Sequence, residues 1–264
     1  MTTLATLWVG RLGPIEMASL ASFARQGQTV LIYSYQPLEG VPPGFENRDA
    51  NEVLPTREVA TYRKEGSPSL HSNFFRYALM RTTDHVWVDL DVIALQPFRF
   101  EAAHVYAYES AERVNCAVLR MPKDSPALAE LSKLGPGTRG VAPHITGLRR
   151  AKYWIKTFGR GVPIEGWPWG STGPRALSTC LKQTGEIRFA MPMETFYPIP
   201  SQACERFLIP GEVTEDSFGP ATLGVHLAAS VVHRIARERH GGTFPEGSFV
   251  ARQVARAQAE GFRA

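Results

Sequence analysis

The chain has 264 residues, of which 44% are hydrophobic and 20% charged, and this is the composition of a folded domain with a substantial core. A net charge of +4 is spread out, apart from Arg149–Lys152 and the last thirty or so residues; it suits a small anionic ligand such as a nucleotide diphosphate and is too weak to indicate nucleic acid as a partner. Cys116, Cys180 and Cys204 have neither metal-ligand nor disulfide spacing, which favours a cytoplasmic setting. We expect no signal peptide, and no run approaches the roughly 18 apolar residues of a membrane span.

The beginning of the chain predicts a strand–helix–strand unit. Leu4–Val9 is a predicted strand, and Ile15–Gln26 is a predicted helix with Pro14 in its first turn. Thr29–Tyr33 is the second predicted strand. This order favours an α/β fold with a mostly parallel central sheet flanked by helices. Ligands of such sheets bind at the carboxyl ends of the strands, which directs attention to the residues around Trp8.

The next stretch leads from a loop to a second helix and a buried strand. Pro37–Arg48 is rich in proline and glycine and predicts a loop, and Asn51–Leu54 predicts a short strand. Ser69–Met80 has apolar residues at helical spacing. Val86–Val88 is a short apolar run with β-branched and aromatic members, which predicts a buried strand.

Two carboxylates, Asp89 and Asp91, follow that strand directly. Because they lie two residues apart, their side chains can point to the same side. Neighbouring carboxylates in an apolar stretch repel each other and are costly to bury unless a cation compensates them. Mg²⁺ or Mn²⁺ is the simplest compensation, and a phosphate ligand would usually accompany it. The alternative is a solvated, aspartate-containing turn, which would not need the apolar residues on both sides.

The remaining predicted elements are short. Strands or extended pieces are expected at Ala103–Tyr108, Val114–Leu119, Arg188–Met191, Phe196–Ile199 and Ala221–Leu227, and helices at Ser125–Leu134, Leu148–Phe158, Pro174–Gln183, Val231–Arg239 and Ser248–Ala259. We expect one domain over residues 1–264, with a less regular subdomain at about 120–220. The last helix is expected to pack on the body of the protein, with contact to a membrane surface as the alternative.

Several blocks, in order, resemble the DXD-containing sugar-binding glycosyltransferases, which include polysaccharide-synthesis transferases and, more distantly, the clostridial glucosylating toxins. Ser72–Tyr77 followed by Val88–Asp91 is similar to the family's S-D-x-x-R and D-x-D block. Further similar segments are Leu7–Gly10, Asn115–Val118, Met121–Lys123, Thr172–Pro174 and Gly224–Leu227. The sequence differs from the family at Asn73, which replaces an acid, at Thr82–His85, which replaces a Gly-Gly pair, and after His226, where an aromatic is missing.

The resemblance implies a single glycosyltransferase-A (Rossmann-like) domain and a hexosyltransferase-type enzyme. Its donor would be a nucleotide-diphosphate sugar, with UDP favoured, its cofactor Mn²⁺ or Mg²⁺, and its acceptor a glycan or glycolipid in polysaccharide biosynthesis, with retention at the anomeric carbon. It would act in the cytoplasm or at the inner face of the membrane. The resemblance also implies site roles: Asp91, Asp89 and His226 for the metal, Trp8, Val9 and Gly10 for the nucleobase, Asn73, Arg76 and Asp89 for the donor, Asn115 for the reacting sugar, and Thr172 and Gly173 for the acceptor.

Two other functions stay open. A haloacid-dehalogenase-like phosphohydrolase also has D-x-D after an apolar strand, with the first aspartate as nucleophile. That motif normally follows the first strand and has Thr or Val where this chain has Ile93. A non-catalytic sugar-nucleotide-binding protein is the second alternative, because a fold can outlast its activity. An enzyme would turn over a bound sugar nucleotide, whereas a binding protein would only bind it.

Overall fold

The computed structural model describes residues 2–264. The helices are α1 Pro14–Arg25, α2 Ser69–Thr82, α3 Pro126–Leu131, α4 Gly147–Lys156, α5 Pro174–Thr184, α6 Ala229–Arg239 and α7 Phe249–Ala259. The strands are β1 Leu4–Leu7, β2 Val30–Ser34, β3 Glu46–Asp49, β4 Val86–Val88, β5 Val92–Ala94, β6 Tyr108–Ser110, β7 Arg113–Val114, β8 Val118–Leu119, β9 Arg139–Gly140, β10 Val162–Pro163 and β11 Gly224–His226. Six short 3-10 helices lie between them within this range.

The central sheet has five strands in the order β3-β2-β1-β4-β8. β1 pairs in parallel with β2 and β4, and β2 in parallel with β3, whereas β8 is antiparallel to β4. The predicted α/β fold with a mostly parallel sheet is therefore confirmed. Because β1 and β4 run the same way, Trp8 and Asp89, which follow them, lie at the same edge of the sheet.

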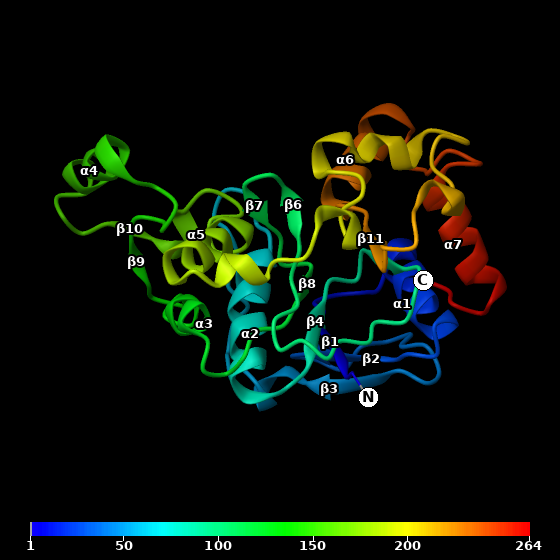
Figure 1. The fold of residues 1–264 in the computed structure, drawn as a ribbon, viewed down its shortest axis with the longest axis horizontal. Coiled ribbons are helices and arrows are strands. Elements are labelled where there is room, and N and C mark those ends of the chain that lie inside the picture. Colours follow the sequence, from blue (N-terminus) through cyan, green and yellow to red (C-terminus); the bar gives the residue numbers. More distant parts are fainter. Residues whose placement is uncertain (1) are drawn as a thin grey trace.

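Both faces of the sheet are buried, as the continuous apolar runs of the strands require. Ala5, Leu7 and Trp87 share one core cluster with residues of α2, whereas Leu4 and Val86 share another with residues of α1. The alternation along β1 and β4 thus sends successive side chains to opposite faces. Figure 1 shows α2 and α1 on either side of the sheet.

A separate pair of antiparallel strands, β5 and β11, extends the fold beyond the aspartates. Two serines of α1 hold β5: Ser19 Oγ donates to the carbonyl of Val92 at 2.7 Å, and Ser22 Oγ accepts from the amide of Ala94 at 2.8 Å. The register places His226 of β11 opposite Val92, so His226 lies beside the second aspartate.

The C-terminal helix α7 packs on the body of the protein, which was the first of its two predicted placements. Phe249, Val250 and Ala257 are buried, and Arg25 of α1 pairs with Glu260 at 2.7 Å. None of the helices formed by residues 2–264 is long and apolar enough to cross a membrane.

Five local predictions were wrong. Residues 196–199 form a turn and a bend after the 3-10 helix Met193–Thr195 rather than an extended piece. Residues 50–52 form a 3-10 helix rather than a strand, and the exposed edge strand β3 lies just before it, in the predicted loop. Residues 114–119 form two strands, because the Asn115 side chain binds the backbone between them. Residues 186–189 are a 3-10 helix, not extended. Around residue 105 only isolated bridges form before β6. Among these segments, β3, which pairs with β2, and the bridge of Val105 to Arg120 depend on partners distant in sequence.

Candidate metal and ligand site

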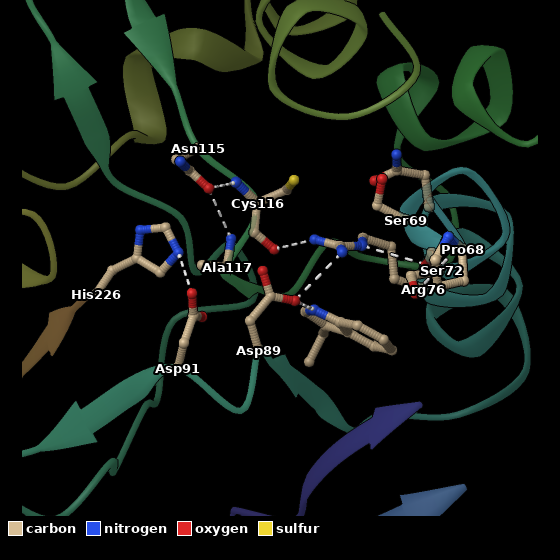
Figure 2. Close-up of polar contacts among 12 residues, drawn as sticks. Pro68, Ser69, Ser72, Arg76, Asp89, Asp91, Asn115, Cys116, Ala117 and His226 are labelled. Atoms are coloured by element: carbon tan, nitrogen blue, oxygen red, sulfur yellow. Dashed lines mark hydrogen bonds and ion pairs between the residues drawn. The ribbon is translucent and has the colours of Figure 1, made fainter. Parts of the chain in front are cut away.

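The two aspartates lie on a turn between β4 and β5, closed by a 3.2 Å hydrogen bond from the amide of Val92 to the carbonyl of Asp89. Leu90 between them is 3% exposed and packs into the core, so both carboxylates point to the opposite side. Asp89, Asp91 and His226 each offer a ligand atom within 4.8 Å of the others. The predicted convergence of the two aspartates is what the structure shows (Figure 2).

Asp89 is held by two donors at one of its oxygens. Trp87 Nε1 donates to Oδ1 at 2.7 Å and Arg76 Nη2 at 3.2 Å, and its backbone amide donates to the carbonyl of Ala117. Burial raises the pKa of Asp89 and so does Asp91, whereas Arg76 lowers it, and the net shift is upward. A partly buried carboxylate of this kind gains from a further cation.

Asp91 is held at its Oδ2 atom. The backbone amide of Ala229, in the first turn of α6, donates to Oδ2 at 2.8 Å, and His226 Nε2 lies 3.3 Å from the same atom. Burial opposes ionisation of Asp91, but His226 and the Ala229 amide outweigh it, and the pKa of Asp91 is lowered. Conversely, burial disfavours the charged imidazole, but Asp91 raises the pKa of His226 above its usual value.

This donor set fits a divalent cation. Two carboxylates and an imidazole converge, and the hydrogen bonds among residues 2–264 use Oδ1 of Asp89 and Oδ2 of Asp91, so the second oxygen of each can bind a metal. Carboxylate oxygens with one imidazole suit Mn²⁺ and, with a weaker preference, Mg²⁺. A metal at His226 would take the place of the proton that Nε2 shares with Asp91.

Arg76, expected at the donor sugar, is mainly engaged with the protein. It is 4% exposed. Its Nη1 donates to the carbonyl of Cys116 at 2.5 Å, its Nη2 to Asp89, and its guanidinium lies 4.5 Å from the Trp87 ring centre. Arg76 therefore orients Asp89 and compensates its charge, and it also borders the cavity into which the two carboxylates open.

Asn115, expected to face the reacting sugar, shapes the β7–β8 link. Its Oδ1 accepts from the amides of Cys116 at 2.6 Å and Ala117 at 2.9 Å, and its Nδ2 donates to Glu109. The two residues that it holds supply the carbonyls that bind Arg76 and the Asp89 amide. Asn115 is thus a positioning residue at the wall of the cavity.

The carboxylates open into a cavity of about 880 Å³, a volume typical of small-ligand sites. Trp8, Asn73 and Arg76 border it, as do Asp89, Asp91, Asn115 and His226, so these predicted site residues surround one space. Val9 and Gly10 are not among its lining residues. Four further arginines line it: Arg113, Arg175, Arg234 and Arg237.

The segment around Thr172 serves α2 rather than the cavity. The Thr172 hydroxyl accepts from Asn73 Nδ2 at 2.9 Å and bonds the Tyr62 hydroxyl at 2.7 Å, and Thr172 is fully buried. A Cβ at Gly173 would lie 3.0 Å from Asn73 Oδ1. Thr172 and Gly173 therefore dock the start of α5 against α2 and do not line the cavity, whereas Pro174 of the same segment and nearby Gly170 do.

Sequence reasoning missed three carboxylates at the cavity: Glu16, Glu65 and Glu109. Glu16 accepts from the amide of Gly13 at 2.9 Å, and burial together with Asp91 raises its pKa. Glu109 bonds both Asn115 and Arg113. The spacing of Gly13 and Glu16 at the start of a helix is a capping signal that could have found Glu16; Glu109 has no comparable local signal.

No family model matches the chain, and no curated protein matches it either. Among solved structures, the chain is similar to one described as PaToxG Glycosyltransferase, at 12% sequence identity with a TM-score of 0.45. The match covers 69% of this chain and 69% of that one.

Proposed function

We propose that this chain is a metal-dependent glycosyltransferase of the glycosyltransferase-A type, which moves a hexose from a nucleotide-diphosphate sugar to a glycan or glycolipid acceptor. The observation that carries the proposal is the cluster of Asp89, Asp91 and His226 at the wall of a cavity that also holds four arginines. When the sugar is transferred, the departing diphosphate carries negative charge, which positive groups beside its phosphates and its leaving oxygen stabilise. This cavity offers a metal site beside cationic side chains.

The chain's own residues have distinct parts in this proposal. Arg76 and Trp87 orient Asp89 and favour its ionised form, and the first turn of α6 with His226 does the same for Asp91. The bound divalent ion would neutralise charge on the departing diphosphate. The amide end of α6 lies beside this position and favours negative charge there. Trp8 at the cavity edge is available to pack against the nucleobase.

Several finer features of the proposal rest on the motif resemblance. These are UDP as the nucleotide, Mn²⁺ as the metal, retention at the anomeric carbon and a role in polysaccharide biosynthesis. We also propose that the whole chain acts as one domain, with the acceptor bound on the side of residues 120–220.

The test is turnover of a panel of nucleotide sugars with Mn²⁺ or Mg²⁺, with products separated by anion-exchange chromatography. A nucleoside diphosphate and a free or transferred sugar are expected from wild type and from Asp84→Asn, a control at an aspartate whose side chain is 91% exposed. Asp91→Asn should lose activity by at least about 100-fold. An NMR assignment of the product anomer tests retention.

Three results would contradict the proposal. Binding of a sugar nucleotide without turnover would indicate the non-catalytic function. Phosphate release from phosphomonoesters, without sugar transfer, would indicate a phosphohydrolase. Equal activity of wild type and Asp91→Asn would remove the carboxylate cluster from the mechanism.

A further inference from the structure

A helix far from the cavity exposes large apolar side chains. In and just after α4, Leu148 is 92% exposed, Ile155 75% and Phe158 93%. Figure 1 shows α4 projecting at the end of the molecule opposite α7. Single exposed apolar residues are common, but three bulky ones within eleven positions form a patch that calls for an occupant.

The patch lies on one side of the helix. Leu148, Ala151 and Ile155 are spaced three and four residues apart, so they share a face, and all three are exposed. Tyr153 and Trp154 lie on the other side and pack against the core cluster around the start of α2. The helix is therefore anchored by its aromatic side chains and presents its aliphatic side chains to solvent.

Basic side chains surround the exposed apolar patch. Arg149, Arg150, Lys152, Lys156 and Arg160 are all exposed, and the ion pairs formed among residues 2–264 include none of them. Residues 131–164 contain seven lysines and arginines and no acid, whereas the whole chain has a net charge of only +4. The positive charge of the protein is concentrated here.

The backbone after α4 forms a tip, residues 157–161, that exposes Phe158. Phe158 has φ +50°, a left-handed conformation that is unfavourable for a bulky residue. Its amide donates to the carbonyl of Ile155 at 3.1 Å, and Gly159 and Gly161 follow with positive φ. An aromatic side chain kept in an unfavourable backbone conformation and exposed to water does not stabilise the fold, so we look for its partner outside the chain.

We propose that α4 and the following tip bind the surface of an anionic phospholipid membrane, with Leu148, Ile155 and Phe158 inserted among the acyl chains and the flanking cations on the headgroups. This combination of aliphatic and aromatic side chains with a basic border is the signature of an interfacial helix. A second copy of this chain would bring like charges together, and nucleic acid would not gain from leucine and isoleucine. The proposal does not depend on the transfer reaction.

The experiment is flotation of the full-length protein with vesicles of phosphatidylcholine alone or with about one third phosphatidylglycerol. Wild type is expected to float only with the anionic vesicles, and less at high salt because the charges are screened. Leu148→Ser/Ile155→Ser/Phe158→Ser should weaken binding by at least about 100-fold. Ile209→Ser, at a 45% exposed site next to η5 (Ser201–Leu208), is the apolar control and should bind as wild type does.

A second pair of variants separates the position of the charge from its amount. Lys152→Gln/Lys156→Gln should weaken binding by about 30-fold. Arg57→Gln/Arg99→Gln removes the same charge at two exposed sites elsewhere and should change it little. All the altered side chains are exposed, so every variant should keep the wild-type melting temperature.

Three results would overturn the proposal: absence of wild-type binding to anionic vesicles, equal binding by the apolar variant, or equal loss in the two charge variants. A dimer of wild type that dissociates in the apolar variant would also overturn it, because the patch would then belong to a second copy.

Discussion

Replacement of Arg76 by methionine removes the cation beside Asp89 while keeping most of the apolar volume of the side chain. The Arg76 side chain is 5% exposed and that of Asp89 30%. Removing one partner of a buried ion pair costs about 3–5 kcal/mol, and the partial exposure of Asp89 puts the expected cost near 3 kcal/mol. For a chain of this size that lowers the melting temperature by about 6–12 °C.

The effect should depend on the charge of Asp89. Arg76 lowers the pKa of Asp89 against the effect of burial, so its removal raises that pKa further above the unfolded value. A protein with a carboxyl group whose pKa is raised on folding becomes less stable as the pH rises. The stability lost in Arg76→Met should therefore shrink as the pH is lowered from neutrality toward about 4. Added Mn²⁺ should recover part of the loss, because it would supply the missing positive charge.

The assay is denaturant unfolding of wild type, Arg76→Met, Asp89→Asn and the double variant. We expect Arg76→Met to cost less in the Asp89→Asn background by about 1–2 kcal/mol, because no carboxylate is left uncompensated. Additive losses, or a deficit that does not change with pH, would refute the conclusion that Arg76 acts by neutralising Asp89.

Three further changes test other parts of the structure. Burial raises the pKa of Glu186, but hydrogen bonds at the start of α3 outweigh it, and the pKa is lowered overall. Glu186→Gln should therefore lower the free energy of unfolding by about 1–3 kcal/mol at neutral pH, measured with denaturant. This difference between the two proteins should vanish as the pH falls from about 4.5 through the folded-state pKa. Asn115→Ala removes the acceptor of two backbone amides, and both should exchange hydrogen faster by NMR; unchanged protection would contradict the role given to Asn115. Gly224→Ala would place Cβ 3.0 Å from the Phe98 ring and should lower stability by about 1–3 kcal/mol, whereas Gly219→Ala meets open space and should be nearly neutral in the same unfolding assay.

The sequence predicted the fold best where the signal is local. The helices at Pro14 and after Pro68, and the buried strands β1, β2 and β4, follow from apolar periodicity and from proline and glycine at helix ends, and their bounds agree with the structure to within about two residues. The same reasoning placed Asp89 and Asp91 together, because two residues apart on a chain leaving a strand is a strong geometric constraint.

The rest of the site depends on contacts that no local pattern contains. The amide of Ala229 binds Asp91 across 138 positions of sequence, and Asn115 meets Glu109 through a turn between short strands. Edge strand β3 consists of polar residues and exists because β2 offers it backbone partners. Patterns of residue type cannot encode such partners, because the partner's position is set by the assembled fold.

The metal site is tested most directly by Mn²⁺ binding, measured by electron paramagnetic resonance on the purified protein. The site predicts one bound ion per chain in wild type and in Asp84→Asn, and a loss of affinity of at least about 100-fold in Asp91→Asn, whose amide can still accept from Ala229 and so should keep the fold. Equal binding by wild type and folded Asp91→Asn would contradict the assignment of Asp89, Asp91 and His226 as the metal site.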